Sequence, residues 1–419
     1  MGTTNRDGRR VVITGMGSIT PLGNSVEEFW QGCVEGRSGI DHLTLFDASK
    51  YPVRIAGEIK EFDPQKYMDY KEARRMARFS QFAVAAARQA IEDAGLKVEG
   101  EDATRIGVVL GNGIGGLPEI EQGDRTVLSK GGMRLDPLWF PKVLPNMAAA
   151  QVSLTFGLKG YNGTMVTACA AATQAMGEAA ELIRRGRADV MVAGGAEGGI
   201  SELGLSGFAV MRAMSTQNAD PQKASRPFDA KRDGFVAADG AAAFVFESLE
   251  HAQARGAPIL CEVVGYAATA DAYHLVAPCA DGDGAARCMA GALADAGLGP
   301  EEVNYINAHG TSTPLNDVAE TVAIKRVFGE RAYQVPISAT KSMIGHALGG
   351  AGALESIACI KTILSGIIHP TINYEYPDPE CDLDYVPNVA RRAEVTVVLK
   401  NSFGFGGQNA CLVFKRFEG

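Results

Sequence analysis

One cysteine stands in a sequence context that suits nucleophilic chemistry. Cys169 follows the run 164–168, which we interpret as a buried strand, and it precedes an alanine-rich stretch that we expect to be helical. A thiol at a strand-to-helix turn lies at the helix N-terminus, where unpaired N–H groups and the helix dipole favour the thiolate. The context therefore predicts a nucleophile at Cys169, with a packed core cysteine as the alternative.

Two of the six histidines are framed by glycine and small residues. His309 comes directly after the predicted strand 303–306, and His346 comes just before the predicted helix that includes Glu355. Because α/β proteins place ligands at strand ends, we expect both rings to project from such ends. A lone histidine more often has a structural role, but two in matching positions, together with a poised cysteine, favour a shared site.

A thiol with two imidazoles from distant parts of the chain suits thioester chemistry. The thiolate attacks an acyl thioester and gives a covalent acyl-enzyme. Loss of CO₂ from a malonyl thioester places negative charge on the thioester oxygen, which two imidazole N–H donors would stabilise. The carbanion then attacks the acyl group on sulfur and makes a C–C bond. No metal or redox cofactor is required.

The elements that must position these groups alternate along the chain. Short apolar runs at 11–14, 106–110 and 190–193 predict strands, and alanine-rich stretches at 73–94 and 170–185 predict helices. This alternation is typical of an α/β fold. The 50 glycines among 419 residues indicate tight turns and close backbone approaches.

An internal repeat predicts two similar α/β halves. The sequence Asp-Ala-Gly-Leu begins at Asp93 and again at Asp295, 202 residues later, and each copy leads into a strand and then glycine. We therefore expect an N-terminal half at 1–256 that carries the cysteine, and a C-terminal half at 257–419 that carries the two histidines. The alternative is chance, because this tetrapeptide is a common helix ending.

Composition narrows the class of protein. A net charge of −9 argues against nucleic acid as a partner, and no apolar run approaches the length of a membrane span. None of the eight cysteines forms a C-x-x-C pair, so a metal site is not expected. The polar, basic N-terminus has no signal-peptide core, which predicts free thiols and a cytoplasmic protein.

The motifs around these residues resemble those of the β-ketoacyl synthase family. The resemblance rests on VTACA at 166–170, HGTSTP at 309–314, KSMIGH at 341–346, NSFGFGG at 401–407, SRPFD at 225–229 with RDGF at 232–235, and DAYH at 271–274. The motifs follow the family's order from about residue 9 to residue 416. Within the family, the sequence is most similar to the elongating type II synthases of bacterial fatty-acid synthesis.

The resemblance implies a fold and a catalytic group. The fold is thiolase-like, with two duplicated halves in five layers, α-β-α-β-α, and is usually a homodimer. Cys169 would carry the acyl chain, and His309 and His346 would drive decarboxylation of the malonyl thioester. Lys341 would organise the site, and Glu355 would be a supporting carboxylate. The acyl groups would arrive on the phosphopantetheine of acyl carrier protein, so no bound cofactor is implied.

The resemblance also implies residues that bind substrate. The backbone N–H groups of Cys169 and Phe405 would form an oxyanion hole, and Phe405 would act as a gate beside Phe403. The remaining residues would be Thr311 and Thr313 for the phosphopantetheine arm, and Phe235 and Ile114 for the acyl pocket.

Docking of an acidic carrier protein predicts a basic patch, because opposite charges steer such encounters. Arg212 is the strongest candidate, since it follows an apolar run near the expected entrance. Lys130 and Arg134, in a glycine-rich segment, come next, and Arg74 and Arg75 are further candidates. For each of these basic residues, the alternative is an ordinary position on a solvated helix face with no role in docking.

Three other functions share this fold. A polyketide ketosynthase with the same three residues stays open as an alternative. A thiolase needs a second cysteine in the C-terminal glycine-rich loop, and 403–409 contains none. A non-catalytic partner subunit that sets chain length would lack the nucleophile, whereas Cys169 is present.

Overall fold

The computed structural model describes residues 8–419, and its principal strands form two halves with one topology. The strand order is β5-β4-β6-β7-β1 in the first half and β10-β9-β13-β14-β8 in the second. In both halves, the two pairings nearest the outer edge are parallel and the two nearest the centre are antiparallel. The repeated order and direction agree with the duplication expected from the sequence.

The two halves meet through a short ladder. β1 pairs with β8 only at Val12↔Glu262 and Ile13↔Cys261, which joins the strands into one ten-stranded sheet. The predicted boundary at residue 256 falls between α9 and β8, and it stays a prediction. The strands are β1 Val11–Ile19, β4 Ile106–Gly111, β5 Asn162–Met165, β6 Val190–Glu197, β7 Gly240–Ser248, β8 Cys261–Ala270, β9 Tyr305–Asn307, β10 Ile337–Ser338, β13 Val397–Gly404 and β14 Gln408–Lys415.

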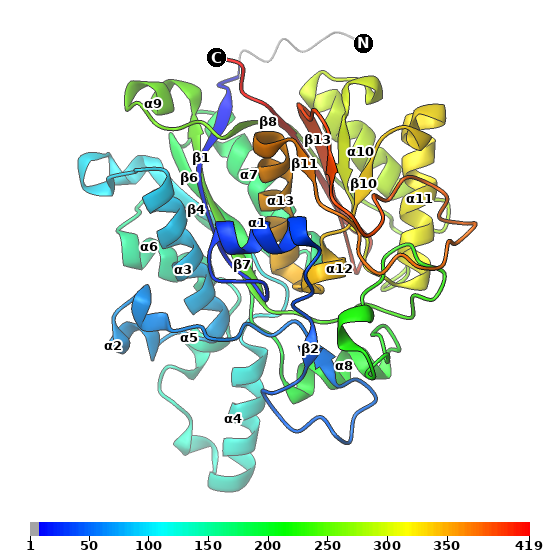
Figure 1. Ribbon diagram of the computed structural model, residues 1–419. Coiled ribbons are helices and arrows are strands. Elements are labelled where there is room, and N and C mark those ends of the chain that lie inside the picture. The colour runs from blue at the N-terminus through cyan, green and yellow to red at the C-terminus, as the bar shows by residue number, and fades with distance from the viewer. Residues whose placement is uncertain (1–7) are drawn as a thin grey trace.

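Helices make three layers around the two halves of the sheet (Figure 1). α7 (Ala171–Arg184) and α13 (Ala351–Ser365) lie in the centre and contact strands of both halves. α3 (Arg78–Asp93) and α6 (Met147–Phe156) cover the outer face of the first half. α10 (Asp283–Ala296), with α11 (Pro314–Phe328) packed on it, covers the second. The five layers are those that the resemblance implied.

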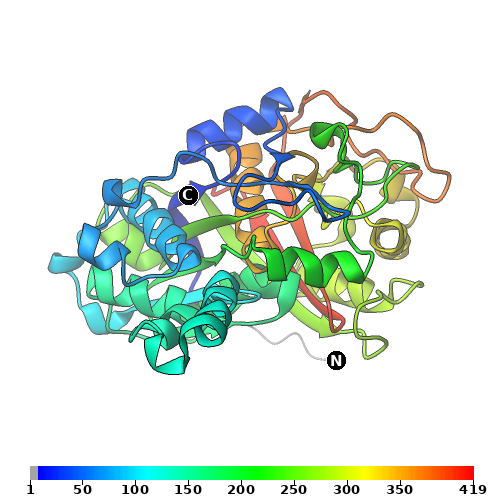
Figure 2. The same cartoon turned by 90° about the horizontal axis from the view of Figure 1, so that it is seen from below.

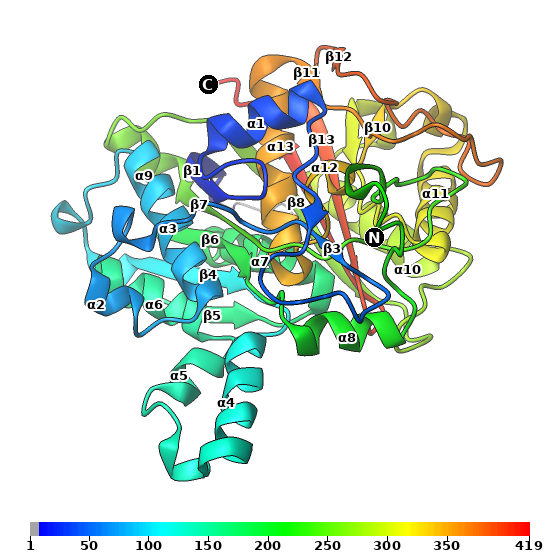
Figure 3. The same ribbon diagram turned by 60° about the horizontal axis from the view of Figure 1, so that its bottom comes forward.

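Smaller elements surround this frame. Figure 3 shows α4 and α5 projecting from the body, and Figure 2, seen from below, shows α8 between the helices of the two halves. The bounds are α1 Val26–Glu35, α2 Tyr70–Ala73, α4 Leu117–Lys130, α5 Trp139–Val143, α8 Glu202–Val210, α9 Leu249–Ala254, α12 Lys341–Ile344, β2 Asp41–His42, β3 Ile55–Ala56, β11 Ile367–Ile368 and β12 Arg391–Arg392.

The central helix α13 is apolar on nearly all sides because protein surrounds it. Within residues 8–419, the stretch Leu348–Ser365 is the one helix that is long and apolar enough to cross a membrane, and 83% of it is buried inside the protein. The helix approaches α7 closely at Gly352, where a Cβ would lie 2.2 Å from Thr173 Oγ1. This contact fixes α13 against the helix that follows Cys169.

Three local predictions are wrong. β1 does not end at Gly15 but runs on to Ile19, since Gly15 and Gly17 stay extended and face the backbone of α3. The predicted helix 73–94 is interrupted, because Ala77 adopts an extended conformation that separates α2 from α3. The run 164–168 is not a buried strand: β5 ends at Met165 at the edge of the sheet, and Val166 is 51% exposed.

Candidate active site

The nucleophile candidate lies on a tight turn between β5 and α7. Residues Ala168–Ala170 form one 3-10 turn, and Ala168 has a φ of 48°, in the left-handed region that non-glycine residues rarely occupy. The turn brings Cys169 to a cavity of about 450 Å³ while leaving it only 8% exposed. Strain at such a position is typical of functional turns.

The cavity gathers most of the residues singled out from the sequence. Its lining includes Cys169, His309, His346, Thr311, Thr313, Phe235, Ile114, Phe403, Phe405 and Arg212. Lys341 and Glu355 are absent from this lining because they are buried behind it. Lys130, the last residue of α4, and Arg134, in the turn after it, are exposed and do not line the cavity.

His309 is oriented by a buried lysine. It follows β9, as predicted, and its backbone carbonyl accepts a hydrogen bond of 2.7 Å from Lys341 Nζ. The same ammonium group lies 3.3 Å from His309 Nδ1. Because an ammonium group can only donate, Nδ1 must accept, so the ring proton of neutral His309 is on Nε2.

His346 does not project from a strand end, and that prediction is wrong. It follows α12 and Gly345, and a short bridge holds its backbone, since its N–H donates to Val236 O at 2.7 Å and its carbonyl accepts from Ala238 N at 3.0 Å. Its ring lies 5.5 Å from the ring of His309, at 83°. Neither ring nitrogen has a hydrogen-bond partner within residues 8–419, so both are available to a ligand.

Lys341 is an interior residue and not a surface lysine. It is 1% exposed, and its ammonium group forms an ion pair with Glu355, which is also buried on α13. Burial of an unpaired cation is costly, so this pairing is a condition for placing a lysine beside His309.

Burial and charge set the protonation states. Burial lowers the pKa of His309 and of His346 well below the usual value, and the positive charge of Lys341 lowers both further. Burial also raises the pKa of the Cys169 thiol to about 11, although Lys341 and a backbone hydrogen bond from Phe405 oppose this. Among these effects burial is the largest; the preference for the thiolate expected from the helix N-terminus stays a prediction.

Aromatic rings form one wall of the cavity. Phe235 lies 5.5 Å from the His346 ring and 5.4 Å from Phe208, which in turn lies 6.4 Å from Phe405. Phe403 lies 5.7 Å from the His309 ring. Phe208 was not identified from the sequence, because α8 shares no motif with the other site residues and reaches the cavity only in the fold.

Two carboxylates of α11 hold the loop that follows His309. Glu320 accepts hydrogen bonds from the backbone N–H of His309 and of Gly310, both at 2.8 Å. Asp317 accepts from the N–H of Thr311 at 3.1 Å. Their spacing of three residues, just after the Thr313 N-cap, places both on one helix face and is the sequence signal that could have identified them.

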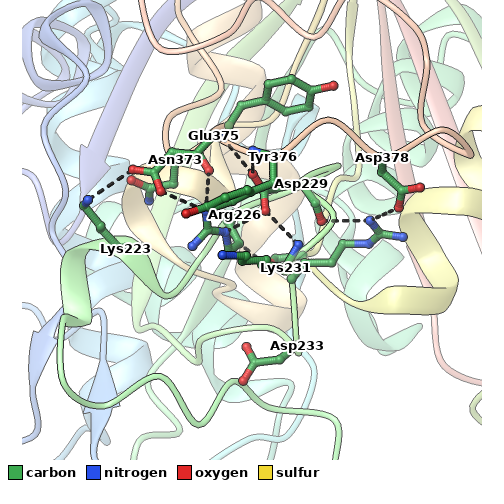
Figure 4. A network of polar contacts seen from close by, with 12 residues as sticks. Lys223, Arg226, Asp229, Lys231, Asp233, Asn373, Glu375, Tyr376 and Asp378 are labelled. Atoms are coloured by element: carbon green, nitrogen blue, oxygen red, sulfur yellow. Dashed lines mark hydrogen bonds and ion pairs between the residues drawn. The ribbon is translucent and has the colours of Figure 1, made fainter.

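A second network of polar contacts surrounds Arg226 and Asp229 and joins their segment to the 373–378 region (Figure 4). The carboxylate of Asp229 accepts hydrogen bonds from the Glu375 and Tyr376 N–H groups, both at 2.7 Å, and pairs with Arg226 at 3.0 Å. The Arg226 N–H in turn donates to Ser312 Oγ at 2.9 Å. The segment 225–229, which carries the SRPFD motif, therefore connects the 373–378 region to Ser312. This serine lies between Thr311 and Thr313, which both line the cavity.

Comparison with known proteins defines the class. The chain matches the family models "Beta-ketoacyl synthase, N-terminal domain" over residues 8–252 and "Beta-ketoacyl synthase, C-terminal domain" over 260–375. The chain therefore belongs to the β-ketoacyl synthase family. A 3-oxoacyl-[acyl-carrier-protein] synthase 2 of Synechocystis sp. is 51% identical to it over 414 residues, which is 99% of this chain and 100% of the relative.

Two solved structures share the fold. A β-ketoacyl synthase from Burkholderia phymatum has a TM-score of 0.91 and 39% identity, covering 98% of this chain and 100% of its own. A ketosynthase bound to a hexaketide, in complex with its type II PKS acyl-carrier protein, has a TM-score of 0.91 and 37% identity, with the same coverage. The thiolase-like architecture expected from the sequence is confirmed.

The buried thiol predicts a distinctive pH profile for alkylation. Since the Cys169 pKa is raised to about 11, the rate of its reaction with iodoacetamide should rise about tenfold per pH unit up to pH 10. Mass spectrometry of the peptide that contains Cys169 measures this rate separately from the other thiols, with Cys169→Ala as the control. A rate that levels off below pH 8 would contradict the thiol environment described here.

Proposed function

We propose that this chain is an elongating 3-oxoacyl-acyl-carrier-protein synthase. It condenses an acyl chain held on Cys169 with malonyl-acyl carrier protein in fatty-acid synthesis. The observation that carries the proposal is the convergence of Cys169, His309 and His346 on one cavity, with the His309 ring oriented by Lys341. Relatives such as the Synechocystis synthase, 51% identical over the whole chain, support this reaction.

The first step transfers the acyl group. Cys169 Sγ attacks the carbonyl carbon of an acyl thioester, the C–S bond to the carrier breaks, and the thiol proton passes to the departing phosphopantetheine sulfur. The backbone N–H groups of Cys169 and Phe405 stabilise the oxyanion that forms on the carbonyl oxygen. The hydrogen bond from Phe405 to the resting thiol places that N–H at the reacting sulfur.

The second step generates the nucleophile. The bond between the malonyl carbon and its carboxylate breaks, CO₂ leaves, and the electron pair delocalises onto the thioester oxygen. His309 Nε2–H and a ring N–H of His346 donate to that oxygen and stabilise the enolate. Fixed neutral donors in a cavity that excludes water are more effective than the same groups in solvent.

The third step makes the C–C bond. The enolate carbon attacks the acyl carbonyl on Cys169, the C–S bond breaks, and the electron pair returns to sulfur, which takes up a proton from solvent to regenerate the thiol. The electrons for the new bond come from decarboxylation, so we propose that the enzyme uses no metal or redox cofactor. Lys341 and Glu355 do not touch the substrate in this scheme; they orient His309.

A polyketide ketosynthase remains the second candidate, since the same three residues perform the same condensation. The solved ketosynthase with a bound hexaketide is 37% identical to this chain, whereas the fatty-acid relative is 51% identical. The higher identity favours fatty-acid elongation.

Two substitutions of the nucleophile separate the steps. Cys169→Ala should reduce condensation by about 10³-fold or more while the protein stays folded. Cys169→Gln should block acylation and still permit malonyl decarboxylation, because both histidines remain. Condensation is followed with acyl and malonyl carrier proteins, and decarboxylation by CO₂ release. Continued elongation by Cys169→Ala would rule out the covalent mechanism.

Arg212 is the proposed docking residue for the carrier protein. It lines the cavity and is exposed, which suits an acidic partner that delivers a phosphopantetheine arm. Thr311 Oγ1 and Thr313 Oγ1, 2.9 Å apart, also line this cavity and would hydrogen-bond the arm. Lys130 and Arg134 lie elsewhere in the fold and have a weaker claim.

Reversal of the Arg212 charge tests the docking proposal. Arg212→Glu should raise KM by about tenfold for carrier-protein substrates and much less for small acyl thioesters. Arg185→Glu is the matched control, since Arg185 is exposed and does not line the cavity. Equal effects on both kinds of substrate would remove Arg212 from the docking surface.

We propose a homodimer that forms through the edge of the first half. Within residues 8–419, β5 pairs only with β4, so it is an edge strand whose other side can pair with another chain. Three exposed apolar side chains lie beside it in the chain: Leu154 at 73%, Tyr161 at 48% and Val166 at 51%. A second copy of the same edge would pair with the β5 backbone and cover this apolar surface.

The free thiols of all eight cysteines support a cytoplasmic location for the protein.

Light scattering after gel filtration measures the assembly. The mass should be twice the 44.1 kDa of one chain, and Val166→Lys should reduce it to that of one chain at micromolar concentration. Leu364→Lys is the control, because Leu364 is 50% exposed on α13, away from β5. A wild-type mass of one chain would end the dimer proposal.

A further inference from the structure

A second buried lysine lies behind the catalytic residues. Lys400 is on β13, the strand whose end carries Phe403, and it is 0% exposed. Burial of an ammonium group is costly unless ionised or polar partners surround it. Lysine is also poorly suited to the interior of an apolar strand, so its place here needs a specific partner.

That partner is Glu355. Lys400 Nζ lies 2.6 Å from Glu355 Oε2, while Lys341 Nζ contacts Glu355 Oε1. The two lysines therefore hold one carboxylate from opposite oxygens. The contact at Oε2 is an ion pair without a hydrogen bond within residues 8–419, and rotation of the carboxylate would break both ion pairs, so Lys400 helps to hold Lys341 against His309.

Lys400 also links this carboxylate to the helix of the nucleophile. Its ammonium group donates to Asn401 O at 2.7 Å and to Ser402 Oγ. Ser402 Oγ lies 2.8 Å from Thr173 Oγ1, on the first turn of α7. A continuous polar path therefore runs from α7, through Lys400 and Glu355, to Lys341 and His309.

The three charges do not cancel. Two ammonium groups share one carboxylate, which leaves a formal surplus of one positive charge next to the histidines. After burial, the positive charges of Lys341 and Lys400 both lower the pKa of His309 and of His346. The other titratable or charged groups around this site include Cys169, Glu197 on β6, Asp271 after β8, Glu320 on α11, Arg212 and Cys279 at the cavity, Cys359 on α13, Cys411 on β14 and His369 after β11.

We propose that Lys400 is a positioning residue of the condensation: it locks Glu355 and Lys341 in place, and its charge keeps both imidazoles neutral. The catalytic meaning rests on the function proposed above. Protonation of His309 Nδ1 would remove the acceptor that faces Lys341, so the ring would lose the orientation that aims Nε2–H at the substrate. Without Lys400, protonation should occur at higher pH, and activity should fall earlier on acidification.

Charge-matched variants separate this role from simple packing. Lys400→Met removes the surplus charge and leaves Glu355 with one partner. Lys400→Arg keeps the positive charge beside Glu355 and leaves Lys341 paired. Lys361→Met is the control, since Lys361 is on the same helix as Glu355 but pairs with Glu27 at 3.7 Å.

The main readout is the pH profile of malonyl thioester decarboxylation. Lys400→Met should move the acid limb up by about one pH unit, which is about a tenfold loss of rate at a pH on that limb. Lys400→Arg should keep the limb at the wild-type position, and Lys361→Met should not move it. An equal loss of rate at every pH in Lys400→Met and in Lys400→Arg would overturn the proposal.

Two further comparisons are available. If Lys400→Met does not fold, Lys400→Gln removes the same charge with a polar side chain, and its acid limb should lie above that of Lys400→Arg. NMR titration of the ring signals of His309 and His346 needs no substrate, so it tests the charge argument even if the proposed reaction is wrong. Unchanged histidine midpoints between Lys400→Arg and the variant without the charge would overturn the role of Lys400.

Discussion

The ammonium group of Lys341 is buried against His309 and Glu355, and much of the site depends on this contact. It determines which nitrogen of the His309 ring carries the proton, and it lowers the pKa of both histidines. A buried cation is stable only with ionised partners, and Glu355 of α13 supplies the carboxylate. The position of α13 in the centre of the protein brings that carboxylate to Lys341.

The duplicated fold explains how such a site can be assembled. Cys169 comes from the first half, and the two histidines come from the second, so neither half contains the reacting group alone. α7 and α13 occupy corresponding places between the two halves, and Gly352 of α13 leaves room for Thr173 of α7, whose hydroxyl group bonds to that of Ser402 on β13. The reaction geometry is thus a property of how the halves pack.

Hydrogen bonds hold two sides of the cavity. Glu320 and Asp317 accept from the backbone of the loop from His309 to Thr313, and the backbone N–H of Arg226 donates to Ser312 Oγ. In the glycine-rich segment with Phe405, the Gly406 N–H donates to Leu275 O at 2.7 Å, and Gly407 O accepts from the Asp271 N–H at 2.8 Å. Both sides of the cavity are therefore held by contacts with other segments of the chain.

The sequence alone determined the family, the α/β class and the repeat, and it singled out the three residues proposed to react, because motif order and residue type are local properties of the chain. It did not determine that β5 is an edge strand, that His346 follows a helix, or that burial raises the pKa of Cys169. Those depend on which segments surround a residue. Lys400 shows the reason most clearly: in the sequence it is one lysine in an apolar run, and only the packing of β13 against α13 gives it Glu355 as a partner and a place beside the histidines.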